Sequence, residues 1–262
     1  MDAVVVAHID ARLDGVERDH GVRIGWAIES GSRAWGFPSP DSDYDCRFVY
    51  LRPATDYLTP WLPRDVIETP LDAVYDVNGW DLRKAVALMA DGNATLLEWL
   101  RSPIVYRGDD ELRTLLLDLA SRIGEPELVA RHYAHLGRRQ WERLGAADPD
   151  ASVKLKGLLY ALRPAAALFW MRAHPGDAVP PMRLQDLLAE TEPPAALESA
   201  VQELIELKSR TRELGSGPIP PPVRDFVVAQ LFADDLDGTG RRHLDASVTR
   251  ALATEAFRTA LS

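Results

Sequence analysis

The first part of the chain carries apolar side chains at helical spacing. Val5, Ile9, Leu13 and Val16 recur every three or four residues, so they lie on one face of a helix. We therefore predict an amphipathic helix over residues 2–20. The short apolar run that follows it, up to the pair Gly31–Ser32, is typical of a buried strand.

Residues 44–51 alternate with a period of two, which is typical of a strand. One predicted face carries Tyr44, Cys46, Phe48 and Tyr50, and the other carries Asp43, Asp45, Arg47 and Val49. We expect further strands near residues 65–68 and 73–80. A helix, a break at Asp91–Asn93 and a second helix are expected to follow.

Helical patterns dominate the rest of the chain. We predict helices over residues 109–123, 125–145, 150–173, 183–190, 194–214, 222–235 and 246–260. The predicted fold class is α+β, with a small mixed sheet flanked by helices and then an all-α C-terminal region. We expect a catalytic domain over residues 1–108 and a helical domain over residues 109–262 that closes the nucleotide cleft.

Composition narrows the class of protein. The 262 residues are 46% hydrophobic and 27% charged, as in a globular protein. We see neither a secretion signal nor an apolar run of about 20 residues, so we expect a cytoplasmic protein without a membrane partner. The single cysteine, Cys46, excludes an internal disulfide and a cysteine-rich zinc site. A net charge of −10 disfavours non-specific nucleic-acid binding as the main activity, although a local basic cleft is compatible with it.

Two aspartates on one strand face indicate a metal site. Asp43 and Asp45 would point together and repel each other unless a cation lies between them. Carboxylates of this kind suit Mg²⁺, which takes one or two of them together with phosphates and water. Asp41 has the same parity, but its turn-like surroundings place it before the strand. A two-metal site needs a third carboxylate, and Asp76 is the best placed, although a plain role at a strand end stays open.

The turn between the two strands suits a phosphate. Gly31 and Ser32 follow a strand and precede a short helix, where free backbone N–H groups bind phosphate oxygens. Ser32 could instead be an ordinary helix cap. Arg33 either adds a charged phosphate donor or pairs with a neighbouring carboxylate.

Together these residues resemble the signature of the DNA polymerase β-type nucleotidyltransferase superfamily. More narrowly, ESGSRAWGFPSPDSDYDCRFVY, NGWDLRKA, LLEWLRSPIVY and KGLLYALRPAAALFW are similar to the RNA-repair-pathway (RlaP-like) family of predicted nucleotidyltransferases. The resemblance implies that Gly31 and Ser32 contact a triphosphate and that Asp43 and Asp45 bind metal. It also implies that Asp76 is the third carboxylate and activates an acceptor hydroxyl.

Two further groups of residues are candidates for binding. Lys156, Tyr160 and Arg163 fall on one helix stripe, which suits either a triphosphate with a stacked base or a salt-bridged surface. The predicted helix over residues 125–145 carries a group of basic residues, His132, His135, Arg138 and Arg139. It is either a solvated face or a surface for an anionic acceptor such as an RNA end.

The hypothesis from the sequence is a nucleotidyltransferase that uses two Mg²⁺ ions, with Mn²⁺ as a substitute. It would transfer a nucleoside monophosphate from a nucleoside triphosphate to a hydroxyl acceptor, on RNA or protein, and release pyrophosphate. The alternatives are a non-catalytic nucleotide- or RNA-binding module and an antitoxin-like protein that modifies or masks a partner protein. The sequence sets neither the acceptor, the preferred base nor the oligomeric state.

Overall fold

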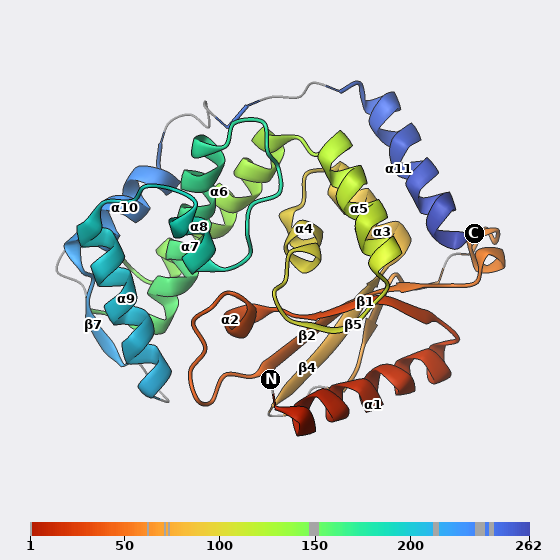
Figure 1. Ribbon diagram of the computed structural model, residues 1–262, viewed down its shortest axis with the longest axis horizontal. Helices are drawn as coiled ribbons and strands as arrows, with labels where there is room; N and C mark the ends of the chain where they lie inside the picture. Colours follow the sequence, from red (N-terminus) through yellow and green to blue (C-terminus); the bar gives the residue numbers. More distant parts are fainter. Residues whose placement is uncertain are drawn as a thin grey trace. The chain divides into compact units, whose positions relative to one another are not determined.

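The computed structural model describes residues 2–61, 63–70, 72, 74–146, 152–211, 215–233, 239–240 and 244–262. The chain divides into two compact units (Figure 1). Unit 1 consists of Met1–Ala34, Asp43–Gly124 and Leu244–Ser262, and unit 2 consists of Trp35–Ser42 and Glu125–His243. The boundary that we expected after residue 108 falls inside unit 1.

Unit 1 is built on a five-stranded sheet with the strand order β3-β4-β2-β1-β5. The strands are β1 (Arg23–Glu29), β2 (Tyr44–Leu51), β3 (Val66–Glu68), β4 (Tyr75–Asp81) and β5 (Val105–Gly108). β2 and β4 are parallel, and the other neighbours are antiparallel. The mixed sheet confirms the predicted α+β class. Strand β5 was not expected from the sequence, because its two exposed and two half-buried residues at a sheet edge show no clear alternation.

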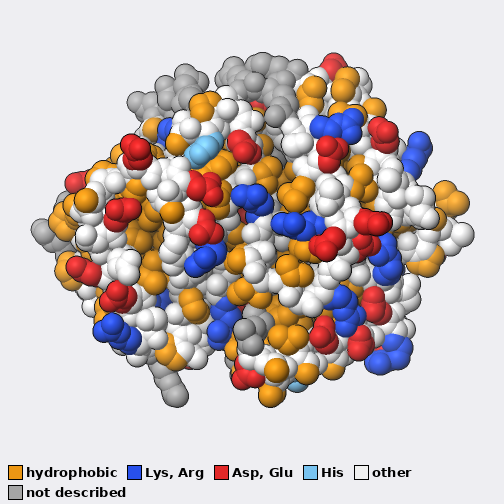
Figure 2. All heavy atoms as spheres, in the orientation of Figure 1, with side chains coloured by type: hydrophobic (Ala, Val, Ile, Leu, Met, Phe, Trp, Pro, Cys, Tyr) orange, Lys and Arg blue, Asp and Glu red, His pale blue; other side chains and the backbone are white. Residues whose placement is uncertain are grey.

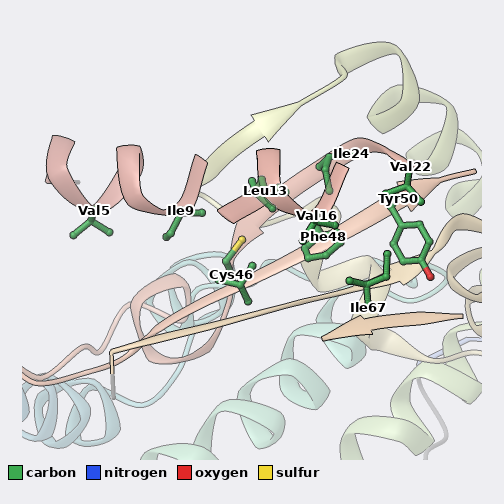
Figure 3. Packing of buried hydrophobic residues seen from close by; sticks show 12 residues of the cluster. Val5, Ile9, Leu13, Val16, Val22, Ile24, Cys46, Phe48, Tyr50 and Ile67 are labelled. Carbon is green, nitrogen blue, oxygen red and sulfur yellow. The ribbon is translucent and has the colours of Figure 1, made fainter. Parts of the chain in front are cut away.

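Helix α1 (Ala3–His20) covers one face of this sheet (Figure 1). Its predicted stripe is buried against side chains of β2, among them Phe48 and Tyr50 (Figure 3). Ile9 and Leu13 have no exposed surface, and burying such a side chain contributes roughly 1.5–3 kcal/mol. The side chain of Asp2 caps the helix start, and Gly21 ends the helix in a left-handed conformation.

The opposite face of the sheet is covered by helices that follow the strands. These are α3 (Leu82–Ala90), α4 (Ala94–Leu100) and α5 (Asp110–Ile123), and α11 (Ala246–Leu261) packs on α3 and α5. Asp81 caps α3 by accepting a hydrogen bond from the N–H of Arg83. Two short elements complete the unit, α2 (Gly31–Ala34) and the 3-10 helix Ala54–Tyr57.

In the described residues of unit 2, the regular structure is helical apart from one small two-stranded sheet. Its helices are α6 (Pro126–Arg143), α7 (Leu155–Ala173), α8 (Leu184–Ala189), α9 (Ala195–Arg210) and α10 (Pro221–Leu231). The predicted helix over residues 150–173 begins only at Leu155, because β6 (Ser152–Lys154) pairs with β7 (Ser216–Pro218). The ends of three predicted helices, residues 150–151, 212–214 and 234–235, fall outside the described residues.

The segment between α2 and β2 belongs to unit 2. Trp35 and Phe37 lie edge-on to Tyr160 of α7, with ring centroids 5.3 and 6.1 Å from it. Among the described residues, no helix combines the length and the apolar character that crossing a membrane requires.

Candidate active site

The two aspartates at the start of β2 and β4 are direct neighbours. The parallel register pairs Asp45 with Asp76, so both side chains leave the same face of the sheet. Their side chains are 29% and 34% exposed, which leaves both accessible to a ligand. This pairing brings the predicted third carboxylate beside the second.

Gly31 lies against the carboxylate of Asp45. Its φ of 59° is in the left-handed region, and a Cβ at this position would be 2.0 Å from Asp45 Oδ2. Only glycine fits both the backbone conformation and the close approach. The glycine-serine turn and the aspartate are thus in contact, as the spacing in the sequence predicts.

We expect Gly31→Ala to destabilise the protein by about 1–3 kcal/mol, because it adds backbone strain and forces Asp45 to move. Gly21→Ala is the matched control, since Gly21 has a φ of 62° but a Cβ added there would meet no other part of the protein within 4 Å. Urea unfolding of both variants measures the difference. Equal losses in the two variants would show that contact with Asp45 plays no part.

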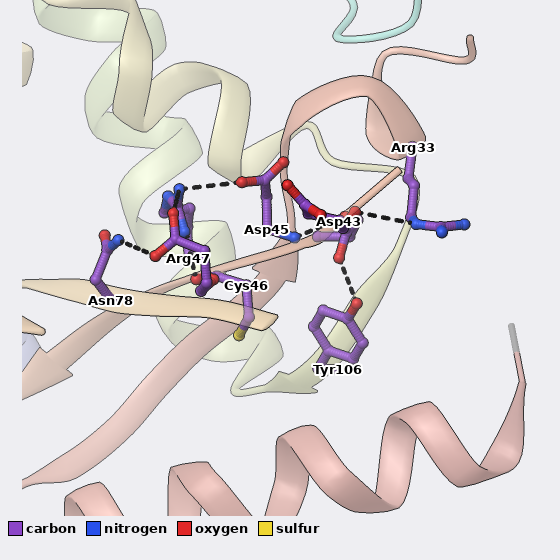
Figure 4. Close-up of polar contacts among 9 residues, drawn as sticks. Arg33, Asp43, Asp45, Cys46, Arg47, Asn78 and Tyr106 are labelled. Carbon is purple, nitrogen blue, oxygen red and sulfur yellow. Dashed lines mark hydrogen bonds and ion pairs between the residues drawn. The ribbon is translucent and has the colours of Figure 1, made fainter. Parts of the chain in front are cut away.

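Asp43 lies just before β2 and is exposed. Its charge acts on Asp45, and Figure 4 shows both residues near the start of β2. Burial raises the pKa of Asp45 above its usual value, and the charges of Asp76 and Asp43 add to the rise. The Arg47 guanidinium opposes it. The three carboxylates therefore share one region, in which negative charge exceeds positive charge.

The donor set suits a hard divalent ion such as Mg²⁺. Asp45 and Asp76 already hold one positive group between them, the guanidinium of Arg47, so their oxygens can be bridged by a cation. In the present arrangement no three carboxylate, imidazole or thiol side chains of the described residues converge on one ion position. Asp45 and Asp76 thus fit a cation as a pair, and Asp43 is an exposed carboxylate near them.

A buried carboxylate that was not predicted from the sequence lies beneath this site. Glu29, at the end of β1, has no exposed surface and accepts a hydrogen bond from the Asp45 N–H at 3.0 Å. Tyr106 of β5 donates its hydroxyl proton to the other carboxylate oxygen (Figure 4). Burial raises the pKa of Glu29 from 4.5 to about 7, against the effect of these hydrogen bonds. A signal was present in the sequence, because Glu29 is a charged residue that ends an apolar run.

We expect Glu29 to make the stability of the protein depend on pH. Between pH 4.5 and about 7 the folded state retains a proton that the unfolded state releases, so stability falls as the pH rises. The loss is at most about 3.5 kcal/mol, at about 1.4 kcal/mol per pH unit. Glu29→Gln should remove this dependence, as urea unfolding at several pH values with a metal chelator would show. An unchanged slope in the variant would contradict the assignment.

The other residues of the turn have contacts of their own. Ser32 is buried in α2. The Arg33 side chain donates to the backbone oxygen of Asp43 at 3.1 Å, and its guanidinium lies 3.9 Å from the ring centre of Tyr44. Phosphate binding by Ser32 and Arg33 stays a prediction.

The predicted stripe on α7 belongs to unit 2. Lys156 is exposed, Tyr160 is half-buried, and Arg163 is 1% exposed. The Arg163 guanidinium donates to the Met182 backbone oxygen at 3.0 Å. It also lies 5.3 Å from the ring centre of Trp35. Arg163 thus supports the packing of unit 2, and nucleotide binding by the three residues stays a prediction.

The basic face of α6 also lies in unit 2. His135 and Arg139 are exposed, whereas His132 and Arg138 are half-buried. Arg138 donates to the Leu231 backbone oxygen at 2.5 Å, so one of the four basic side chains is held by α10. On the face shown in Figure 2, basic and acidic side chains of the described residues are interspersed. Nucleic-acid binding by the α6 face stays a prediction.

Comparison with known proteins gives two matches. The model of the family RlaP, RNA repair pathway DNA polymerase beta family, matches residues 5–252. The chain is also 39% identical over 219 residues to the uncharacterized protein YcgL of Bacillus subtilis (strain 168). That similarity covers 84% of this chain and 82% of YcgL.

Proposed function

Because the chain belongs to the RNA repair pathway DNA polymerase beta family, we propose that it is a magnesium-dependent nucleotidyltransferase. Membership of this family suggests nucleotidyltransferase-type activity. The observation that carries the proposal is the contact between the glycine turn and the carboxylates: Asp45 rests against Gly31, and Asp76 lies beside it in register. A turn that can accept phosphates thus adjoins oxygens that can hold their counter-ions.

The proposed reaction is an in-line transfer of a nucleoside monophosphate. The oxygen of an acceptor hydroxyl forms a bond to the α-phosphorus, and the bond from that phosphorus to the α–β bridging oxygen breaks. Pyrophosphate leaves with the electron pair of the broken bond, and the hydroxyl proton passes to the carboxylate of Asp76. Magnesium, held by Asp43 and Asp45, would supply charge neutralisation at the phosphates.

The remaining residues of the site would bind the triphosphate or hold Asp45 in place. Backbone N–H groups of the turn at Gly31 and Ser32 would bind the triphosphate oxygens, and Arg33 would add positive charge. Glu29 holds the backbone of Asp45 from below through its hydrogen bond to the Asp45 N–H. Because Gly31 and Glu29 already lie against Asp45, these two residues would need little reorganisation during transfer.

The test is incubation with each α-labelled nucleoside triphosphate, Mg²⁺ and one acceptor at a time. The acceptors are RNA with a free 3′ hydroxyl and a whole-cell protein extract. Label on RNA or on protein supports the proposal and identifies the acceptor class. If nucleotide binds but no labelled product forms with any nucleotide and either acceptor, the proposal is wrong. The protein would then be a non-catalytic nucleotide-binding module.

A further inference from the structure

Arg47 lies between two of the proposed catalytic carboxylates. Its Nη2 is 2.6 Å from Asp76 Oδ2 and 3.3 Å from Asp45 Oδ1 (Figure 4). Arg47 is two residues after Asp45 on β2, so its side chain leaves the same face of the sheet. It reaches across to β4, where the parallel register places Asp76.

The guanidinium is held in place from a second side as well. Its Nη1 donates to the backbone oxygen of Asp76 at 2.9 Å and to that of Cys46 at 3.0 Å. The Arg47 side chain is only 18% exposed. Such a set of four contacts makes this guanidinium a fixed part of the sheet edge, unlike a solvated surface arginine.

Both carboxylate oxygens of Asp76 already accept a hydrogen bond, one of them from Arg47. Asp76 Oδ2 accepts from Arg47, and Asp76 Oδ1 accepts from the Asn78 amide at 3.0 Å. A divalent ion at Asp76 Oδ2 would lie beside the positive charge of the Arg47 guanidinium, and the two like charges would repel each other. Asp43, by contrast, is exposed and lies outside these four contacts of Arg47.

We propose that Arg47 is an internal cation that occupies the ion-binding position between Asp45 and Asp76 and withdraws before a divalent ion binds there. This inference rests on the proposed metal-dependent function and deepens it. It divides the carboxylates into an open pair, Asp43 and Asp45, and a closed pair, Asp45 and Asp76. Arg47 thereby keeps Asp76 out of action until the closed pair is opened.

The same contact explains how the ion-free protein tolerates its carboxylates. Asp45 and Asp76 face each other across adjacent strands, and like charges in this position destabilise a sheet. Arg47 offsets one of these two negative charges, which lowers the repulsion between them without a metal ion. Without Arg47 the pair would gain affinity for a divalent ion, because the repulsion would then be relieved only by that ion.

The experiment is titration of the nucleotide-free protein with Mn²⁺, followed by electron paramagnetic resonance. We expect Arg47→Met to bind about one more Mn²⁺ per chain than the wild type. The dissociation constant for this ion should be at least about tenfold lower in Arg47→Met than at the same position of the wild type. Asp76→Asn should change Mn²⁺ binding of the wild type by less than about twofold. The same substitution in the Arg47→Met background should abolish the gain, which would show that the two residues are coupled.

Arg52→Met is the matched control, because Arg52 is another shielded arginine near the end of β2 and pairs with Asp81 instead. It should leave Mn²⁺ binding unchanged. Thermal unfolding adds a second readout. With a chelator, Arg47→Met should unfold at a lower temperature than the wild type. Mg²⁺ should then raise the unfolding temperature of Arg47→Met by more than it raises that of the wild type. Mn²⁺ binding by folded Arg47→Met that is equal to or weaker than wild-type binding would overturn the inference. Because no nucleotide is used, this result is independent of whether the protein transfers one.

Discussion

Asp45→Asn is expected to lower the rate of nucleotide transfer by at least about 10²–10³-fold, and Asp43→Asn is expected to do the same. An amide cannot supply the negative oxygen that an ion between these residues requires. Asparagine has nearly the same shape as aspartate, so the packing of Asp45 against Gly31 should remain. The measurement is the initial rate of label transfer at saturating nucleotide and Mg²⁺.

The fold should survive both changes. Burial and the neighbouring carboxylates raise the pKa of Asp45, which means that its charge is a cost to the folded state. Asp45→Asn should therefore unfold at the same urea concentration as the wild type or at a slightly higher one. The matched control is Asp41→Asn, because Asp41 has the same parity as Asp43 and Asp45 but belongs to unit 2, whereas those two residues belong to unit 1. Full activity of Asp45→Asn, or an equal loss in Asp41→Asn, would refute the assignment.

Lys208→Met is expected to raise the stability of the protein by about 1–3 kcal/mol at neutral pH. Lys208 of α9 is 1% exposed, and among the described residues its Nζ has no hydrogen-bond acceptor. It faces the rings of Phe37 and Tyr160, whose centres are 4.6 and 5.5 Å from Nζ. Methionine has a similar length and carries no charge, so its burial has no cost of removing a charge from water.

The effect of Lys208 on stability should depend on pH. Burial lowers the pKa of Lys208 from 10.5 to about 8; the charge of Lys156 adds to this effect, and that of Asp41 opposes it. Between about pH 8 and 10.5 the unfolded state holds a proton that the folded state has lost. Wild-type stability should therefore rise with pH through this window, and the advantage of the methionine variant should disappear.

Lys154→Met is the control for this prediction, because Lys154 is exposed in β6 and its replacement removes the same charge. Its stability should stay within about 0.5 kcal/mol of the wild type. Urea unfolding between about pH 7 and 10.5 compares the three proteins. A Lys208→Met variant that is less stable than the wild type at neutral pH would show that contacts with the two rings outweigh the cost of burial.

Much of the candidate site could be read from local patterns in the sequence. Alternation along residues 44–51 places Asp43, Asp45 and Arg47 on one side of the strand. Gly31 and Ser32 mark the turn before it, and helical spacing predicted α1 and its buried stripe. These features depend on residues that are close together in the chain, where the backbone geometry of a helix or strand fixes which side chains share a face.

The tertiary structure alone decided which of these residues meet. Asp76 lies beside Asp45 only because β2 and β4 pair in parallel with this register, and Arg47 bridges the two only because of that pairing. The tertiary structure also buries Glu29, whose carboxylate accepts a hydrogen bond from Tyr106 of β5. Strand β5 has no clear signal in the sequence. Strand pairing and burial depend on contacts between residues that are distant in the chain. Periodicity within a segment carries no information about them, so the sequence determined the chemical groups and the fold determined their partners.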